Sequence, residues 1–331
     1  MIVAELSANH NGSKQLAIDS IKAIKECGAD AVKFQTYTAD TITIKSNKKD
    51  FKIIGTIWDN KYLYDLYNEA YTPWEWHKEL FDVAKEEGLI CFSTPFDKTS
   101  VDFLEQLNNP IYKIASFEIT DIPLIEYVAS KGKPMILSTG IATNEDIELA
   151  LETCYKMNNR DITLLKCTSS YPAPIEEANL IMIKDLAERY NVKTGLSDHT
   201  IGFIAPVAAT CLGAKVIEKH FIIDRKIGGP DSSFSMNKEE FAEMVTLIRE
   251  AEKSIGLVNY SLSTNQIKSR SFCRSLYAVE NINKGDIISE KNIRSIRPGF
   301  GLHPKLLNEI IGKTAKQDIE KGEPLELNLF E

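Results

Sequence analysis

The chain opens with IVAELS (residues 2–7), an amphipathic segment over residues 14–27, and a second apolar run, AVKFQ (residues 31–35). Short β-rich runs that alternate with amphipathic segments predict strand–helix units and a parallel sheet. The pattern recurs, and strands are expected at residues 2–7, 31–35, 89–94, 111–114, 134–138, 162–167, 193–196 and 215–218. Helices are expected among them at residues 14–27, 73–87, 145–157, 177–190 and 238–254.

Eight strand–helix units within about 255 residues match the size and order of a closed (β/α)₈ TIM barrel. An open, doubly wound sheet has the same local pattern, so periodicity alone does not separate the two folds. However, SANHNGS (residues 7–13) follows the first strand without the GxGxxG of a dinucleotide-binding sheet. Two helix starts look like capping boxes, Thr72-Pro73 with Glu75, and Asn237 with Glu240.

The pattern changes after residue 260. Residues 261–271 are polar and are interpreted as a linker, and short strands follow at residues 275–279, 287–288, 293–296 and 312–315. INKGDI (residues 282–287) and IEKGEP (residues 319–324) echo each other, each with a glycine suited to a turn that needs positive φ. The predicted organisation is a barrel over 1–260, a linker over 261–271, and a small pseudo-symmetric β domain over 272–331.

One predicted connection is unusually long. About 35 residues separate the second strand from its helix, whereas most such loops have about 2–6. The loop carries Trp58, Tyr62, Tyr64 and Tyr67. This aromatic content argues against disorder and favours a functional lid.

Composition narrows the class of protein. The 331 residues carry a net charge of −8 at a pI near 5.4, which gives no electrostatic footprint for nucleic acid. No signal peptide or membrane span is expected, because the start is polar and no run of about eighteen apolar residues occurs. The six cysteines lack CxxC spacing, which is typical of free thiols in a reducing compartment. A cytoplasmic enzyme is therefore expected.

Polar residues gather where the predicted strands end, the face at which a barrel places its catalytic groups. They are Glu5, Lys33, Gln35, Thr94, Lys113, Ser116, Glu118, Ser138, Ser169, Tyr171, Ser197, His199, Glu218 and His220. Each has a simpler explanation when taken singly, such as a helix cap for a serine or a solvated rim charge for a lysine. Their concentration at one end of otherwise apolar strands indicates a site.

Three kinds of chemistry are suggested by these residues. His199 and His220 end neighbouring strands about 4.8 Å apart, so their imidazoles could share a metal ion, or each could make only local hydrogen bonds. Lys33 and Lys113 suit a small phosphorylated carboxylate. The hydroxyls that would complete that cradle belong to Thr94, Ser116, Ser138 and Ser197. Glu5 and Glu118 suit general acid–base work or sugar binding, although Glu118 could instead be a helix N-terminal charge.

A family resemblance rests on eight strings in order. They are AELSANH (4–10), VKFQ (32–35), STPFD (93–97), KIASFE (113–118), LSTG (137–140), CTSSYP (167–172), LSDHT (196–200) and EKHF (218–221). They resemble the sialic acid synthase family over nearly the whole chain. The C-terminal part, with RPG at residues 297–299, resembles that family's antifreeze-like (SAF) domain, a β-clip fold. Residues 63–77 are most similar to the pseudaminic acid synthases of the family.

The resemblance implies a barrel that binds phosphoenolpyruvate and a divalent cation, most often Mn²⁺, with Mg²⁺ or Co²⁺ as alternatives. His199 and His220 would hold the metal. Phosphoenolpyruvate would contact Lys33, Thr94, Lys113, Ser116, Ser138, Ser169, Tyr171 and Ser197. Catalytic groups near the sugar would be Glu5, Gln35, Glu118 and Asp231. Tyr64 would contribute to the sugar site, and Arg297 would reach it from the SAF domain of the partner in a domain-swapped homodimer. One residue departs from the family pattern, because Ser169 stands where the family usually has asparagine.

The implied reaction joins phosphoenolpyruvate, water and 2,4-diacetamido-2,4,6-trideoxy-L-altrose to give pseudaminic acid and phosphate. Synthesis of N-acetylneuraminate or legionaminic acid on the same scaffold is the nearest alternative. A heptulosonate or octulosonate synthase would need a second anion site, for which no lysine or arginine cluster is apparent. A non-catalytic carbohydrate-binding protein built around the C-terminal module would leave the polar strand ends unexplained.

Overall fold

The structure is a computed structural model that describes residues 1–331. Its contacts divide the chain into two compact units, Met1–Gly256 and Leu257–Glu331, and each is described by itself.

The first unit is a closed barrel of eight parallel strands, in which each strand pairs with the next and β8 pairs with β1. The strands are β1 (Ile2–Glu5), β2 (Ala31–Thr36), β3 (Ile90–Pro95), β4 (Tyr112–Ile114), β5 (Met135–Ser138), β6 (Ile162–Cys167), β7 (Lys193–Asp198) and β8 (Val216–His220). The predicted TIM barrel is confirmed, and the open doubly wound sheet is excluded by the β1–β8 pairing.

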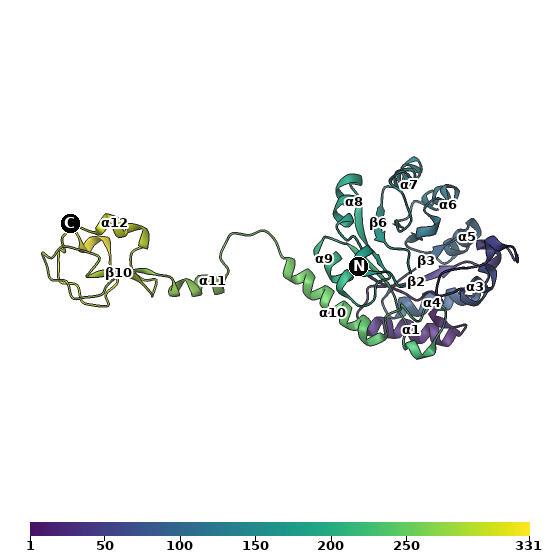
Figure 1. Cartoon of the computed structure of the whole chain (residues 1–331), viewed down its shortest axis with the longest axis horizontal. Coiled ribbons are helices and arrows are strands. Elements are labelled where there is room, and N and C mark those ends of the chain that lie inside the picture. The colour runs from purple at the N-terminus through teal and green to yellow at the C-terminus, as the bar shows by residue number, and fades with distance from the viewer. The chain divides into compact units, whose positions relative to one another are not determined.

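Helices surround the strands, as the barrel unit in Figure 1 shows. They are α1 (Lys14–Glu26), α4 (Trp74–Glu86), α5 (Lys98–Gln106), α6 (Ile122–Ala129), α7 (Asn144–Lys156), α8 (Met182–Tyr190), α9 (Ile204–Cys211) and α10 (Lys238–Ile255). None of the helices in the chain combines the length and the apolar character that crossing a membrane requires.

Local hydrogen bonds decide where these helices begin. The predicted capping box of Asn237 and Glu240 is present at the start of α10. The one predicted at Thr72 is wrong, because Pro73 is the N-cap of α4 and Thr72 Oγ1 lies 3.2 Å from His10 Nε2 instead. The helix expected over residues 177–190 begins only at Met182, because Asn179 has a φ of 43°, which is incompatible with a helix.

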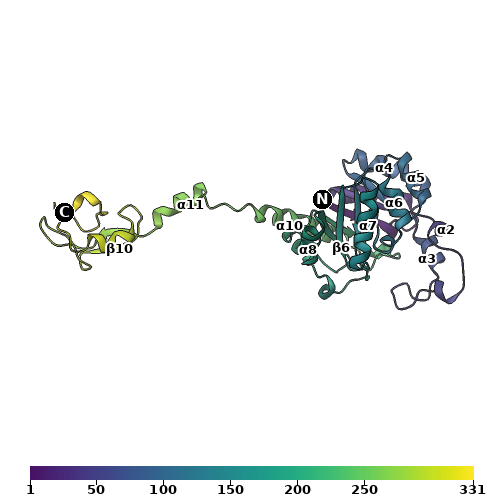
Figure 2. The same cartoon turned by 90° about the horizontal axis from the view of Figure 1, so that it is seen from above.

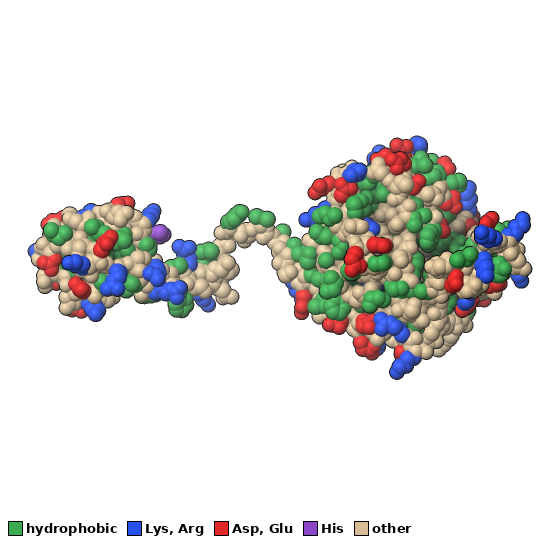
Figure 3. All heavy atoms as spheres, viewed as in Figure 1, with side chains coloured by type: hydrophobic (Ala, Val, Ile, Leu, Met, Phe, Trp, Pro, Cys, Tyr) green, Lys and Arg blue, Asp and Glu red, His purple; other side chains and the backbone are tan.

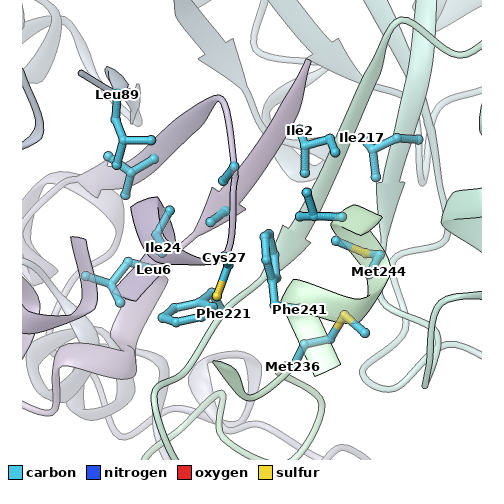
Figure 4. Packing of buried hydrophobic residues seen from close by; sticks show 14 of the residues in the cluster. Ile2, Leu6, Ile24, Cys27, Leu89, Ile217, Phe221, Met236, Phe241 and Met244 are labelled. Carbon is cyan, nitrogen blue, oxygen red and sulfur yellow. The ribbon is translucent and has the colours of Figure 1, made fainter. Parts of the chain in front are cut away.

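Apolar side chains fill both sides of the barrel wall. Outside it, Ile2 of β1 and Leu6, which directly follows β1, belong to one cluster with Ile24 of α1 and with Phe241 and Met244 of α10 (Figure 4). Complete burial of each such side chain contributes about 1.5–3 kcal/mol to folding. Inside the barrel a second cluster comprises Val3, Ala31, Phe92, Ile136, Leu165 and Val216. This inner cluster is an apolar plug that supports the site described below.

The long connection over residues 37–72 is folded. It contains α2 (Ala39–Ile42), a 3-10 turn (Lys49–Phe51) and α3 (Leu63–Ala70). Figure 2 shows α2 and α3 within a segment that projects at one edge of the barrel unit. On the face of that unit seen in Figure 3, acidic and basic side chains are interspersed.

The second unit is small and built around the antiparallel pair β9 (Ser275–Ala278) and β10 (Ile293–Ile296). The two echoing segments lie side by side, because Ile282 and Ile319 exchange backbone hydrogen bonds of 2.9 and 2.8 Å. Their glycines, Gly285 and Gly322, have φ values of 92° and 93°, as predicted. The strands expected at residues 287–288 and 312–315 are reduced to single bridges, and the expected linker contains α11 (Thr264–Ser269).

Candidate active site

The interior of the barrel changes from apolar to polar within two residues along its strands. Side chains two apart on a strand share one face. Two residues beyond the members of the apolar plug stand Glu5, Lys33, Thr94, Ser138, Cys167 and Glu218, all buried. The strand ends therefore carry one polar layer directly over the apolar plug.

Four charged side chains form the centre of this layer. Lys33 forms an ion pair with Glu5, and its Nζ also lies 3.6 Å from Glu218 Oε1. Lys113 Nζ lies 3.7 Å from that same Glu218 oxygen. A buried charge is costly unless it is paired, so the two lysines and two glutamates neutralise one another in the absence of other ions.

The pKa values of this cluster differ according to the number of partners. Burial raises the pKa of Glu5, and the charge of Lys33 does not fully offset it. Burial acts on Glu218 in the same direction, but Lys113 and Lys33 together leave its pKa below the usual value. The pKa of Lys113 is lowered by burial, whereas the two glutamates raise that of Lys33. Lys113 is thus the less completely paired lysine, and an added anion would stabilise its charge.

Hydroxyl groups surround the charges. Lys33 Nζ donates to Thr94 Oγ1 at 3.2 Å, and Ser197 Oγ donates to Glu218 Oε1 at 3.0 Å. Ser138 Oγ is buried without a hydrogen-bond partner. Such a group is available to a ligand, because an unpaired buried hydroxyl is unfavourable.

A glycine keeps the space between two further hydroxyls open. A Cβ on Gly140 would lie 2.2 Å from Ser169 Oγ and 2.7 Å from Ser116 Oγ, which is too close for either atom to remain in place. The backbone N–H of Gly140 donates to Ser116 Oγ at 3.1 Å. The absence of a side chain here lets two hydroxyls and an amide converge.

The two predicted histidine ligands lie side by side, His199 directly after β7 and His220 at the end of β8, with ring centroids 5.4 Å apart. His199 Nδ1 lies 3.0 Å from Thr168 O, which leaves its Nε2 free, and His220 Nδ1 is buried without a hydrogen bond. Burial holds the pKa of His220 well below its usual value, so its imidazole is neutral, the form that binds metals. No third His, Cys, Asp or Glu joins them in a ligand set. The pair fits a divalent cation that keeps positions for water and substrate oxygens.

A cavity of about 380 Å³ opens beside this polar layer. Its lining is mainly apolar and includes Tyr37, Ile42, Ile53, Trp58, Leu63, Leu66, Tyr67, Phe96, Phe117, Tyr171 and Phe234. Gln35, Glu118, Ser169, His220 and Asp231 supply polar groups to the same walls. Gln35 Nε2 donates to Glu5 Oε1 at 3.1 Å and so connects the cavity to the charged cluster.

Trp58 brings the long loop over this cavity. Its Nε1 donates to Pro230 O at 2.9 Å. Its ring centroid lies 5.6 Å from that of Tyr171 and 6.4 Å from that of Phe234. The loop over residues 37–72 is therefore attached to the segment that follows β8.

Glu118 is an isolated carboxylate in the cavity wall. Its Oε2 is buried and has no hydrogen-bond partner. Burial raises the pKa of Glu118 from 4.5 to about 7, although the charge of Lys113 opposes the change. A group with this pKa can give or take a proton near neutral pH.

Asp231 is a second carboxylate in the cavity wall, close to His220. Its Oδ2 accepts a hydrogen bond of 2.5 Å from Ser7 Oγ and one of 3.4 Å from the Ala8 N–H, and lies 3.9 Å from His220 Nδ1. Burial raises the pKa of Asp231 above its usual value, although the hydrogen bonds from Ser7 and Ala8 oppose the change. Ser7 has a φ of 46°, a left-handed conformation that costs a residue with a Cβ about 1–2 kcal/mol.

The structure brings together the sequence-predicted site residues of the barrel, with one exception. Tyr64 does not line the cavity, and its hydroxyl donates to Asp40 Oδ2 at 3.3 Å. Arg297 belongs to the second unit, where its exposed guanidinium makes no hydrogen bond or ion pair.

The structure adds groups that the sequence analysis gave no individual role in the site. Glu218 was among the predicted strand-end polar residues, and the structure shows that one of its oxygens lies close to both lysines. Cys167 Sγ lies 3.8 Å from His199 Nδ1. Burial alone would raise the pKa of the thiol, but the contact with His199 outweighs it and the pKa falls to about 7. Trp58 and Ser7 carry no spacing signal, because their positions depend on the path of a loop and on an unusual backbone angle.

Comparison with known proteins places this site in a family. Residues 20–260 match the NeuB family, and residues 274–331 match the SAF domain. The chain belongs to the NeuB family. The membership predicted from the sequence motifs is confirmed, as is the SAF domain at the C-terminal end.

Two relatives and one solved structure show the extent of the similarity. The pseudaminic acid synthase of Campylobacter jejuni subsp. jejuni serotype O:23/36 (strain 81-176) is 50% identical over 329 residues, 99% of this chain and 96% of the relative. The pseudaminic acid synthase of Helicobacter pylori (strain ATCC 700392 / 26695) is 49% identical over 325 residues, 98% of this chain and 96% of the relative. The crystal structure of N-acetylneuraminic acid (sialic acid) synthetase from Leptospira borgpetersenii serovar Hardjo-bovis in complex with citrate has a TM-score of 0.72 at 30% identity, covering 81% of this chain and 89% of the other.

The raised pKa of Glu118 predicts a pH-dependent effect of Glu118→Gln on stability. The carboxyl stabilises the fold fully below its unfolded pKa of 4.5, and this contribution is lost as the pH rises through about 7. At pH 8 the variant should therefore be more stable than the parent by up to about 3 kcal/mol, at about 1.4 kcal/mol per pH unit, and the difference should vanish near pH 4.5. Urea unfolding followed by tryptophan fluorescence measures this in the barrel, which contains all three tryptophans. Glu86→Gln, at an exposed position of α4, is the control, and a difference independent of pH would contradict the assignment.

Removal of either imidazole should abolish binding of a divalent cation. His199→Ala and His220→Ala each leave a single nitrogen ligand, which cannot hold the ion against water. Mn²⁺ binding is measured from the loss of the electron paramagnetic resonance signal of the free ion. His303→Ala, at an exposed position of the second unit, should bind Mn²⁺ like the parent. Undiminished binding in both barrel variants would place the cation elsewhere.

Proposed function

We propose that this chain is a pseudaminic acid synthase, which joins phosphoenolpyruvate, water and 2,4-diacetamido-2,4,6-trideoxy-L-altrose into pseudaminic acid and phosphate. The observation that carries the proposal is a pair of buried lysines next to a largely apolar cavity, at the strand ends of a NeuB-family barrel. The two relatives that share about half of their residues with this chain bear the same name.

Lys33 and Lys113 bind the phosphate and carboxylate of phosphoenolpyruvate in this proposal. Thr94, Ser116, Ser138, Ser169 and Ser197 supply hydroxyl donors around the anion, and the Tyr171 ring bounds its side toward the cavity. The lysines are fixed and shielded from water, so they stabilise the charge of the departing phosphate without reorganisation. The less completely paired Lys113 gains most from the anion.

His199 and His220 would hold a divalent cation, Mn²⁺ in our proposal with Mg²⁺ or Co²⁺ as alternatives. When bound there, the cation supplies Lewis acidity toward the aldehyde oxygen of the open-chain sugar. The neutral, unpaired nitrogen of His220 supports this assignment.

The glutamates accept and donate the protons of the reaction in this proposal. The methylene carbon of phosphoenolpyruvate bonds to the aldehyde carbon, water adds at C2, and phosphate leaves with the bridging oxygen. Glu5, whose raised pKa makes its carboxylate the stronger base, accepts the proton of that water, while Gln35 orients Glu5 by a hydrogen bond. Glu118, with a pKa of about 7, holds a proton for the sugar oxygen at neutral pH. Asp231 binds a polar group of the sugar.

The apolar walls support the choice of acceptor. The trideoxy-altrose carries a methyl group and a second acetamido group, which favour a more apolar pocket than N-acetylmannosamine requires. Ile42, Trp58, Leu63 and Phe96 of the cavity wall supply such a surface. No second cluster of lysine or arginine lines the cavity, as a phosphorylated sugar would require.

We further propose a homodimer in which the SAF domain of one subunit caps the site of the other. The unpaired guanidinium of Arg297, with Phe300 exposed three residues later, supports a role at such a cap. The cap would exclude bulk water from reactive intermediates. Free cysteines and dependence on phosphoenolpyruvate support a cytoplasmic location.

The proposal is tested by phosphate release from phosphoenolpyruvate and Mn²⁺ with two acceptors side by side. Release is expected with the trideoxy-altrose and not with N-acetylmannosamine, because only the former fills the apolar walls. Omission of Mn²⁺ with added EDTA should stop the reaction. Release with N-acetylmannosamine alone would instead favour N-acetylneuraminate synthesis. Absence of release with these and with the legionaminic precursor would reject synthase activity and leave carbohydrate binding as the alternative.

Trp58→Ala should weaken use of the acceptor and spare phosphoenolpyruvate. Loss of the ring opens the cavity wall, and we expect the KM for the sugar to rise roughly tenfold, equivalent to about 1.4 kcal/mol. Trp58→Phe keeps a ring but loses the bond to Pro230 O, so its effect should be smaller. Ile54→Ala, at an exposed position of the same loop, is the matched control. Equal changes in both substrates' KM values would show that Trp58 acts on the whole site.

A further inference from the structure

Ser7 occupies an unusual place where the chain leaves β1. Its φ of 46° lies in the left-handed region, which residues with a Cβ rarely adopt. The residue is only 4% exposed, and it lines the cavity. A serine gains nothing locally from this conformation, so neighbouring groups must hold it.

Hydrogen bonds from the next turn hold the segment in place. Asn9 Nδ2 donates to Phe221 O and to Ser235 Oγ, each at 2.8 Å. Ser235 Oγ donates in turn to Asp231 O at 2.6 Å. The 3-10 turn Ser7–His10 is thus fastened to the segment after β8, and Asp231 lies at the point of attachment.

The left-handed turn directs two donors at one oxygen. Ser7 Oγ and the Ala8 N–H both donate to Asp231 Oδ2, at 2.5 and 3.4 Å. No side chain or backbone group of the chain bonds to Oδ1 of the same carboxylate, and Asp231 is one of the residues that line the cavity. One oxygen is held while the other is left for a ligand.

We propose that Ser7 is a positioning residue that holds the Asp231 carboxylate so that its second oxygen meets the acceptor sugar. The inference rests on the proposed function for the identity of the acceptor. Ser7 is not expected to contact phosphoenolpyruvate, because the lysines that would bind that substrate form a separate cluster around Glu218. Loss of the hydroxyl should therefore affect the acceptor alone.

Two substitutions separate positioning from backbone strain. Ser7→Ala removes the hydroxyl and keeps a Cβ at positive φ, whereas Ser7→Gly removes the hydroxyl and relieves the strain. Both should lower kcat/KM for the acceptor by about 10- to 100-fold, the scale of a misplaced reacting group, with the KM for phosphoenolpyruvate unchanged. Ser7→Gly should nevertheless have the higher Tm of the two. Asn158→Gly, which relieves an exposed left-handed residue outside the site, should keep full activity.

A double-mutant cycle tests the route through Asp231. In an Asp231→Ala background, Ser7→Ala should cause no further loss of kcat/KM, because the group it positions is gone. Additive losses, or recovery of activity in Ser7→Gly in step with its Tm, would overturn the proposal.

A crystal structure of Ser7→Ala supplies a readout that does not need turnover. The Asp231 carboxylate should rotate or shift relative to the parent, and an unchanged carboxylate would overturn the proposal whatever reaction the protein catalyses. Failure of the parent to release phosphate with any acceptor would reject the proposed function instead, so the two failures are distinguishable.

Discussion

Pairing of β1 with β8 closes the sheet, and every feature of the site depends on that closure. It sets Glu5 beside His220, two residues from opposite ends of the barrel sequence, and Lys33 pairs in register on the other side of Glu5. Because side chains alternate along a strand, a slip of one residue would turn Glu5 or Lys33 into the apolar layer under the helices. The charged cluster opposes such a slip, because a buried Glu5 or Lys33 would then lose its ion-pair partner.

Two environments meet at the mouth of the barrel. The charged cluster is buried, compact and electrically balanced, whereas the adjoining cavity is bounded mainly by aromatic and aliphatic groups. Gln35, Glu118, His220 and Asp231 lie where the two meet. Such an arrangement can hold a small, highly charged molecule and a larger, less polar one in contact, which is the requirement of a condensation between them.

Much of this was predictable from the sequence, for identifiable physical reasons. All eight barrel strands were predicted close to their observed bounds, because apolar runs report burial directly. Barrel order then brings their polar ends together, so Lys33, Lys113, His199 and His220 could be grouped without a structure. Contacts between distant segments could not be predicted. The hydroxyl of Thr72 contacts His10 and therefore does not cap α4. The path of the long loop places Trp58 in the cavity wall and leaves Tyr64 outside it. The catalytic roles of the grouped residues remain predictions that the proposed experiments test.

The space kept open at Gly140 also constrains how this protein can evolve. Every single-nucleotide change that alters a glycine codon to another amino acid adds a Cβ, and any Cβ there would enter the region shared by Ser116 and Ser169. No single-nucleotide change that replaces the amino acid therefore leaves this space open. An amino-acid replacement at this position must displace the hydroxyls of Ser116 and Ser169 from their present positions.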